Sequence, residues 1–249
     1  MPRPQRITRD LLLDAAMQIV DADGLDGLTM RRLGQTVGAV PAMVYRFFAD
    51  KSELVEALAD RLFAQARHRG SPPEPAPADP GPPELEQLRQ VAHGIRRSLL
   101  AHPALVAAAV RRPPRQEATL RGLDAGLGLL LAAGLDPEAA AKGYQAVLFY
   151  TLGFAALEAP FAAAPDGGVQ DQADTHAVLA RLPAEQYPQI AATVDHLYGP
   201  DLTAQFDHGL RLLLAGLRAQ PATAGSTSTH GTTPQPAPLT TDATGVPWT

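Results

Sequence analysis

Residues 29–48 read TMRRLGQTVGAVPAMVYRFF and predict two short helices joined by a tight turn. Thr29 is a good N-cap for the first helix, because its hydroxyl can accept a hydrogen bond from an early backbone N–H. Gly38 fits the turn, since a positive φ costs little without a Cβ. Pro41 fits the first position of a helix that continues over residues 42–48. Together these features are typical of a helix-turn-helix, although a plain helical hairpin has the same pattern.

Helical signals flank this stretch on both sides. Thr8 predicts the start of a first helix, and Gly24 fits the glycine that ends it. Asp50 and Glu53 have the spacing of a capping box, which predicts a fourth helix that runs to about His68. Residues 1–69 are therefore expected to form a small three-helix DNA-binding domain with the start of a connecting helix.

Charge supports a DNA-contacting surface only locally. The whole chain carries −5, but residues 1–70 carry +1 and the remainder carries −6. Four cations fall between residues 30 and 51, namely Arg31, Arg32, Arg46 and Lys51. A local basic cluster is what phosphate contact requires, whereas the charge of the whole chain decides little. The alternative for Arg31 and Arg32 is an ordinary solvated face.

The rest of the chain predicts a second, larger helical unit. Prolines crowd residues 70–83, which predicts a linker, and residues 220–249 have the composition of a disordered tail. Between them, residues 84–219 are rich in Ala and Leu and poor in aromatic residues, which favours an all-α fold. The segment from residue 162 to 174 is expected to be a loop. Helices are expected at about 84–101, 103–111, 115–133, 137–159, 175–181, 188–198 and 202–219.

Ordered motifs resemble the DNA-binding domain of the TetR (tetracycline-repressor) family over residues 6 to about 65. They are LLDAA at 12–16, GLDGLTMRRL at 24–33, VYRFF at 44–48 and KSEL at 51–54. The larger unit resembles the ligand-binding domain of the tetracycline-repressor branch. Its motifs are LLAHP at 99–103, YTLGF at 150–154 and FDHGLRLLLAGL at 206–217. The resemblance implies a homodimeric repressor that leaves a palindromic DNA operator when a small molecule binds.

The resemblance also assigns the DNA contacts residue by residue. It places Thr29, Arg31, Tyr45, Arg46 and Lys51 at phosphate- or groove-contacting positions. Hydroxyl, guanidinium and ammonium groups are suited to phosphate. Three further residues fall where base edges are read: Pro41, Ala42 and Met43. None of these three donates a side-chain hydrogen bond, so readout would rest on apolar contact, with Arg31 as the polar reader. Tyr45 has the alternative of a residue at the edge of the core.

A ligand-binding face is expected on the helix at 137–159. Tyr150, Phe154 and Glu158 stand at i, i+4 and i+8, so they share one helix face that could line a pocket or simply pack in the core. The tetracycline-repressor branch has a metal-binding histidine where this chain reads Ala at 107–109. Tetracycline with Mg²⁺ is therefore not the expected effector, and no metal site or cofactor is expected.

Dimerisation is expected through a four-helix bundle formed by the helices at 137–159 and 202–219 of two subunits. The apolar stripe of the second helix supplies the interface, and its alternative is a core within one subunit. The stripe consists of Phe206, Leu210, Leu213, Leu214 and Leu217.

Other classes of function have less support in the sequence. The chain has no cysteine and no phosphate loop, nucleophile elbow or HExxH motif, so no catalytic residue is predicted. His93, His102 and His208 are expected to be partnered or surface residues rather than ligands. A helical ligand- or partner-binding protein without DNA, or a helical-bundle enzyme, remains the alternative. The most apolar run, residues 146–157, is too short to span a bilayer, and a cytoplasmic location without membrane contact is expected.

Overall fold

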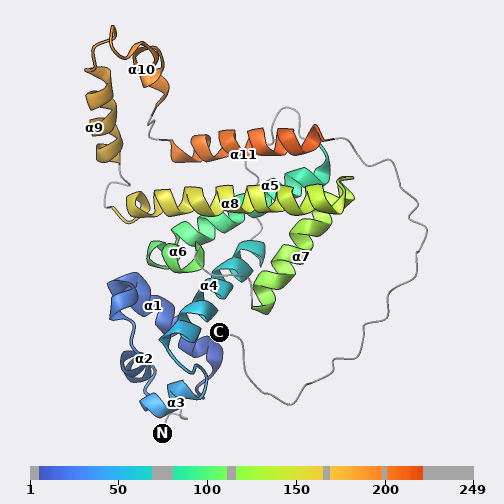
Figure 1. Ribbon diagram of the computed structural model, residues 1–249. Helices are drawn as coiled ribbons and strands as arrows, with labels where there is room; N and C mark the ends of the chain where they lie inside the picture. The colour runs from blue at the N-terminus through green and yellow to red at the C-terminus, as the bar shows by residue number, and fades with distance from the viewer. Residues whose placement is uncertain (1–5, 69–80, 111–115, 165–168, 198–200, 221–249) are drawn as a thin grey trace, which may run out of the picture.

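The computed structural model describes residues 6–68, 81–110, 116–164, 169–197 and 201–220, and all regular structure in them is helical (Figure 1). The all-α prediction is therefore confirmed. Apart from residues 81–83 and 220, the linker expected at 70–83 and the tail expected at 220–249 lie outside the described residues. The helices are α1 (Arg9–Gly27), α2 (Met30–Thr36), α3 (Pro41–Tyr45), α4 (Lys51–His68), α5 (Pro83–Leu100), α6 (Pro103–Val110), α7 (Glu117–Ala132), α8 (Pro137–Ala162), α9 (Val169–Ala180), α10 (Pro188–Thr193) and α11 (Leu202–Arg218), with a 3₁₀ turn at Val194–His196.

The predicted N-caps of the first two helices are confirmed, but Gly24 does not end α1: it has a φ of 69° at a kink inside the helix, which continues to Gly27. The backbone N–H of Leu11 donates to Thr8 Oγ1 at 3.2 Å, and that of Arg32 donates to Thr29 Oγ1 at 3.1 Å. Gly38 has a φ of 68°, so the turn between α2 and α3 uses the left-handed conformation that glycine adopts at least cost. The sequence of the helix-turn-helix thus determines its own ends.

The next two elements differ slightly from expectation. The third helix is shorter than predicted and ends at Tyr45, after which the chain turns toward α4. At the start of α4, the N–H of Glu53 donates to Asp50 Oδ1 at 2.8 Å, as a capping box requires. The returning bond comes from the N–H of Ala49 to Glu53 Oε2 at 2.6 Å, one residue earlier than in the usual box.

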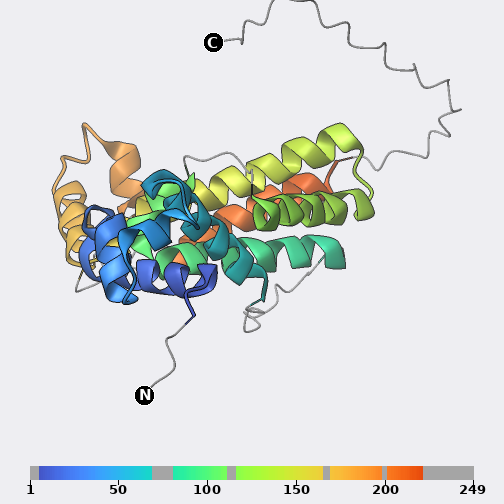
Figure 2. The ribbon, with the colours of Figure 1, turned by 90° about the horizontal axis from the view of Figure 1, so that it is seen from below.

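The larger unit is built on four long helices, α5, α7, α8 and α11, which run side by side (Figure 2). One expectation about it was wrong. The segment expected to be a loop contains the first half of α9, which begins at Val169. The apolar run at 146–157 is only the middle of the 26-residue helix α8, which is long and apolar enough to cross a membrane by length and composition alone.

The hydrophobic core forms two clusters. The first continues from the DNA-binding unit into the larger one: Leu33 of α2 and Leu58 of α4 belong to the same cluster as Leu105 of α6 and Ala155 of α8. The second lies among α5, α7, α8 and α11. Because the first cluster spans both units, a shift of α6 or α8 changes the packing of α1 and α4.

The apolar stripe of α11 lies inside the subunit. Phe206 and Leu210 are fully buried, Leu214 and Leu217 are nearly so, and all four belong to the second core cluster. Only Leu213 is half-buried. A side chain that is buried within one subunit cannot contact a second one, so the interface expected from this stripe needs correction, and its alternative as a core within one subunit describes these four residues.

Candidate DNA-binding face and effector pocket

The helix-turn-helix lies at the end of the molecule farthest from α11 (Figure 1). Its third helix is fixed by Val44 and Phe48, which are both fully buried. Gly34 allows α2 to approach the turn closely, because a Cβ there would lie 2.7 Å from the Ala39 carbonyl oxygen. This packing leaves the opposite side of α3 free for contact with a major groove.

Most residues predicted to touch DNA are exposed. Tyr45 is 52% exposed, which supports a surface role over one at the edge of the core. Met43 and Lys51 are half-buried, so part of each side chain is used in packing. The other predicted contacts are all exposed, namely Thr29, Arg31, Pro41, Ala42 and Arg46.

The cations of this region differ in their availability. Arg32 forms an ion pair with Asp23 and donates to the Gly27 carbonyl at 3.4 Å, so it braces the turn between α1 and α2. Within the described residues, Arg31 and Arg46 have no ion-pair partner. These two guanidinium groups are therefore the ones that can neutralise phosphates without first breaking an internal bond.

Lys51 combines a structural role with its predicted one. Its Nζ donates to the Leu25 carbonyl oxygen at 2.5 Å, which ties the start of α4 to the end of α1. An ammonium group has three donors, so this bond leaves two for phosphate. Lys51 thus fixes the position of α4 relative to the DNA-binding helices.

The sequence analysis missed one residue of this face. Val40 is 66% exposed and immediately precedes α3. An exposed β-branched residue next to Pro41 and Ala42 extends the apolar surface that would meet the floor of the groove. Its position directly after the glycine turn was the signal that could have identified it.

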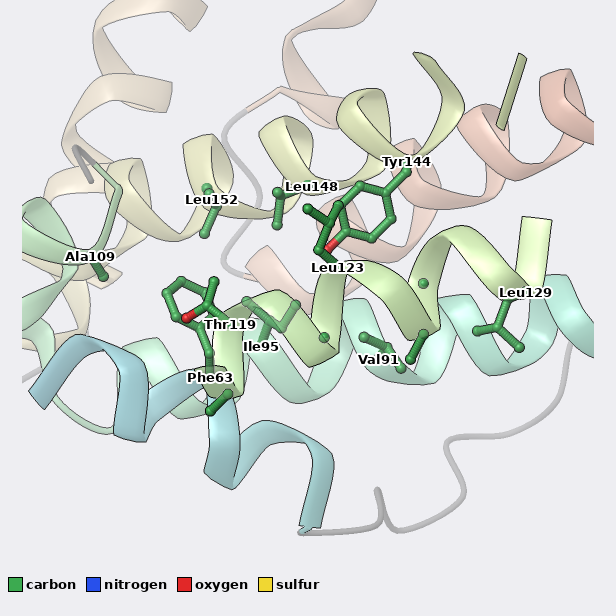
Figure 3. Close-up of a pocket in the computed structure, with 14 residues that line it drawn as sticks. Phe63, Val91, Ile95, Ala109, Thr119, Leu123, Leu129, Tyr144, Leu148 and Leu152 are labelled. Atoms are coloured by element: carbon green, nitrogen blue, oxygen red, sulfur yellow. The ribbon is translucent and has the colours of Figure 1, made fainter. Parts of the chain in front are cut away.

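A pocket lies where α4 meets the larger unit, between α4, α5, α6, α7 and α8 (Figure 3). It encloses about 830 Å³ of empty space, counting its open mouth. Figure 3 shows Val91 and Ile95 of α5 on one side and Leu148 and Leu152 of α8 on the other. The remaining lining residues are Phe63, Ala109, Ala118, Thr119, Gly122, Leu123, Ala125, Gly126, Leu129 and Tyr144.

The pocket is apolar with few polar groups, as ligand pockets usually are. It contains no charged side chain among its lining residues. Tyr144 lies so close to α7 that a Cβ on Gly126 would be 2.3 Å from its ring. Ala109 lies where the tetracycline-repressor resemblance would place metal-binding chemistry, and it offers only a methyl group.

None of the three residues predicted to bind ligand lines this pocket. Tyr150 instead stacks on Phe206 of α11, with ring centroids 5.3 Å apart, and donates from its hydroxyl to the Phe206 carbonyl at 2.9 Å. Burial raises the pKa of the Tyr150 phenol, which keeps it a neutral donor. The pocket face of α8 carries Tyr144, Leu148 and Leu152. It precedes the predicted face by six residues, which corresponds to a rotation of about 240° around the helix.

Glu158 is engaged by a buried arginine. Its carboxylate accepts from Arg96 Nε at 2.7 Å and from Nη2 at 2.6 Å, and the Arg96 guanidinium also lies over the Phe206 ring. Both oxygens are thus occupied by a bidentate ion pair. Phe154 and Glu158 do line a second cavity, which holds about 590 Å³ of empty space when its open mouth is counted. Its other lining residues are Leu157, Phe161, Gln172, Leu202 and Gln205.

The histidines considered as ligands have other surroundings. His93 is buried with its Nε2 3.3 Å from Asp207 Oδ1, and His102 Nδ1 lies 2.8 Å from Asp21 Oδ1. His208 is exposed on α11. Two of the three are thus partnered and the third is on the surface, as the sequence analysis expected.

Two family descriptions match the chain. Residues 12–58 match bacterial regulatory proteins of the tetR family, and residues 79–221 match the tetracyclin repressor-like C-terminal domain. The second match covers more than half of the chain, and the two together include the predicted DNA contacts and every lining residue of the pocket except Phe63.

Individual relatives agree with these matches. The HTH-type transcriptional repressor DrrR1 of Streptomyces coeruleorubidus is 30% identical over 87% of this chain and 78% of its own. The class C tetracycline repressor of Escherichia coli is 30% identical over 85% of this chain and 91% of its own. The crystal structure of the TetR family protein ActR of Streptomyces coelicolor, in complex with actinorhodin, superposes with a TM-score of 0.72 at 27% identity, covering 86% of this chain and all of ActR. The chain therefore belongs to the TetR family of DNA-binding transcriptional repressors, with an effector-binding C-terminal domain of the tetracycline-repressor type.

Proposed function

We propose that this repressor binds a palindromic operator as a homodimer and leaves it when a small apolar molecule enters the pocket between α4 and α8. The observation that carries the proposal is the shared helix: α4 begins at the DNA-binding face with Lys51 and contributes Phe63 to the pocket wall. Members of the family are regulators rather than enzymes, which removes the helical-bundle enzyme as an alternative. As a bacterial DNA-binding regulator, this repressor would act in the cytoplasm.

DNA binding would divide between positioning and reading. The phosphate contacts would set the register of α3 in the major groove without choosing a sequence, and they would come from Thr29, Tyr45, Arg46 and Lys51. Arg31, at a phosphate- or groove-contacting position, would be the polar reader of base edges. Apolar contacts to the base edges would come from Pro41, Ala42 and Met43. The neighbouring Val40 would add its methyl groups, which suit thymine methyls. One such helix reads only a few base pairs, so a two-fold dimer on a palindrome supplies the remaining specificity.

The dimer would form through the outward faces of α8 and α11. On α8, Phe149 is 65% exposed and Leu157 is 76% exposed, with the small residue Gly153 between them. On α11, Leu212 is 62% exposed, and a Cβ on Gly216 would meet nothing within 4 Å. Only 28% of the most apolar window of α8 is buried within the subunit. A second copy of the same two helices would cover this surface and form the four-helix bundle that the family resemblance implies.

The effector would be a small organic molecule without a bound metal. The lining of this pocket has no carboxylate that would hold a tetracycline–Mg²⁺ chelate. Glu158, which lines the second cavity, is paired with Arg96. The relative ActR was crystallised with actinorhodin, a small organic molecule, which supports this class of effector.

The test begins with DNA selected by the protein. Fragments of the source genome that are retained by the purified repressor should share an inverted repeat, with half-sites about one helical turn apart. A library screened by thermal shift then supplies ligands, and each ligand is titrated with and without the operator. Effector and operator should weaken each other by the same factor. Ligands that stabilise the protein and leave its operator affinity unchanged would refute release by this pocket.

A further inference from the structure

A carboxylate on α4 caps the helix that forms one wall of the pocket. Asp60 Oδ1 accepts from the Thr119 backbone N–H at 2.9 Å and from the Thr119 hydroxyl at 2.6 Å. Thr119 lies in the first turn of α7, and Gln116, at the N-cap position, makes no capping side-chain hydrogen bond of its own. The cap of α7 is therefore supplied from another element, and a negative charge there also suits the helix dipole.

Thr119 belongs to the pocket lining as well, so it contacts both the effector space and α4. A threonine hydroxyl has one proton and two acceptor lone pairs. Its proton is already donated to Asp60. Toward the pocket, this oxygen can therefore only accept a hydrogen bond, and a ligand that satisfies it must carry an O–H or N–H donor.

The position of Asp60 along α4 connects its contact with Thr119 to both ends of that helix. Lys51 ties the start of α4 to the Leu25 carbonyl in the DNA-binding unit, and Phe63, less than one turn beyond Asp60, lines the pocket. A displacement of the first turn of α7 thus acts on α4 through a charge-assisted hydrogen bond, at a point between its DNA end and its pocket end. Packed helices transmit such a shift as a rigid element.

We infer that the effector is an apolar molecule with a hydrogen-bond donor that binds Thr119, and that Asp60 is the positioning residue that passes its binding on to α4. This inference rests on the proposed function and adds to it the chemistry of the effector and the route of release. A donor on the ligand also polarises the Thr119 hydroxyl, which strengthens the bond to Asp60 because linked hydrogen bonds are cooperative.

The chain offers a matched control for this route. The Ser98 hydroxyl of α5 donates to the Leu62 carbonyl of α4 at 2.8 Å. This bond also joins the larger unit to α4, at a position two residues from Asp60, but Ser98 is not among the lining residues of the pocket. Ser98→Ala therefore removes a connection to α4 without removing a group that meets the effector.

The experiment uses two probes of one shape. 1-Naphthol carries an O–H donor, and 1-methylnaphthalene has a methyl group in its place. For each protein, the Kd of selected operator DNA is measured with and without saturating probe, and the ratio of the two values is the release factor. In the wild type, 1-naphthol should give a release factor of about tenfold, within the usual range of allosteric coupling, and 1-methylnaphthalene a smaller one.

The variants distinguish a loss of transmission through Asp60 from general damage to the fold. Asp60→Ala should bring the 1-naphthol release factor below roughly threefold. Asp60→Asn keeps an acceptor oxygen for Thr119 and should restore it, and Ser98→Ala should match the wild type. Because the release factor is a ratio, a change in basal DNA affinity cancels. If Asp60→Ala fails to fold, Thr119→Val against Thr119→Ser tests the same hydroxyl with the backbone cap retained.

Three outcomes would overturn the inference, and they differ in what else they affect. An unchanged release factor in Asp60→Ala or Thr119→Val removes Asp60 from the route and leaves the proposed function in place. Equal factors for the two probes in the wild type remove the need for a donor. Binding of 1-naphthol with no effect on the DNA affinity of the wild type overturns this inference and release by the pocket together.

Discussion

The cationic side chains of the DNA-binding face differ in whether they have an internal partner. Arg32 is committed to Asp23, and the Lys51 ammonium to the Leu25 carbonyl, whereas Arg31 and Arg46 have no ion-pair partner among the described residues. A guanidinium without an internal partner keeps its full charge for phosphate. Affinity for any DNA sequence should accordingly depend strongly on Arg46, whereas Arg31 is also available to read a base edge.

Arg46→Ala should weaken binding to specific and random DNA by a similar factor. Each phosphate contact releases about one counterion, so the slope of log K against log salt should become shallower by roughly one unit. Fluorescence anisotropy between low and moderate salt measures this slope. Arg121→Ala is the control, since Arg121 is an exposed arginine on α7, paired with Glu117 and far from α3. An unchanged slope in Arg46→Ala would show that this side chain does not touch phosphate.

Two glycines of α7 provide a matched test of the pocket wall. A Cβ at Gly126 would lie 2.3 Å from Tyr144, whereas one at Gly128 would meet nothing within 4 Å. Gly126→Ala should therefore destabilise the protein by about 1–3 kcal/mol, the usual cost of overpacking. Gly128→Ala should be neutral or stabilise by up to about 1 kcal/mol, as expected for an open helix position. Urea denaturation of both variants checks the difference, and equal effects would mean that α7 and α8 are not in close contact.

At the scale of helices, the sequence predicted where several helices begin and end, but it did not predict how they are oriented relative to one another. Thr8, Thr29, Gly38 and Asp50 determine ends through bonds within a few residues, so pattern alone predicted them. The pocket face of α8 was missed because several of its faces are apolar, and only packing against α5, α7 and α11 decides which one meets a cavity. For the same reason, the sequence pattern alone did not show that the apolar stripe of α11 packs inside the subunit instead of between subunits.

Charge also organises the contact between α5 and α11. Arg89 is buried, donates to Glu86 from Nε and Nη2 at 2.9 Å each, and reaches Asp207 of α11 at 3.4 Å. The hydrogen bond from Arg89 holds the pKa of Glu86 below its ordinary value of 4.5; burial opposes this shift, and a hydrogen bond from Gln90 adds to it. A carboxylate whose pKa is lower in the folded state stabilises the fold at pH values above its pKa in the unfolded state. This stabilisation is lost as the pH falls through the pKa of the folded state.

Glu86→Gln should therefore lower the free energy of unfolding by about 1–2 kcal/mol at pH 7, since a hydrogen bond to a charged group is lost. The difference from the wild type should shrink as the pH falls from about 5 to 3. Urea titrations across this range measure it. Glu117→Gln, which breaks an exposed pair with Arg121 on α7, should change stability by at most about 0.5 kcal/mol at any pH. A constant difference between Glu86→Gln and wild type would contradict the assignment.

At the scale of the whole molecule, the exposed apolar side chains of α8 and α11 are a feature that a single chain does not explain. Two copies related by a two-fold axis would bury it and place two α3 helices on one face of DNA. The DNA-binding units, with a charge near zero, would then lie together at one end, away from the acidic remainder.

Phe149→Asp should convert the dimer into a monomer, because the interface would bury a charge without a partner. Light scattering should give the mass of one chain, and operator affinity should fall with the loss of the second half-site. Leu131→Asp, at a residue of α7 that is 47% exposed and off this face, should remain dimeric. A Phe149→Asp protein with the mass of two chains would place the interface elsewhere.

The close approach of Gly126 and Tyr144 has a consequence for how such a repressor evolves. Any glycine codon becomes an alanine codon by one base change, and here that change would force the Tyr144 ring to move and so reshape the pocket. The DNA-binding face lies on other helices and would keep its sequence. A single mutation could thus give a lineage a new inducer while its target genes stay the same, provided the stability lost at position 126 is tolerated or recovered elsewhere in the chain.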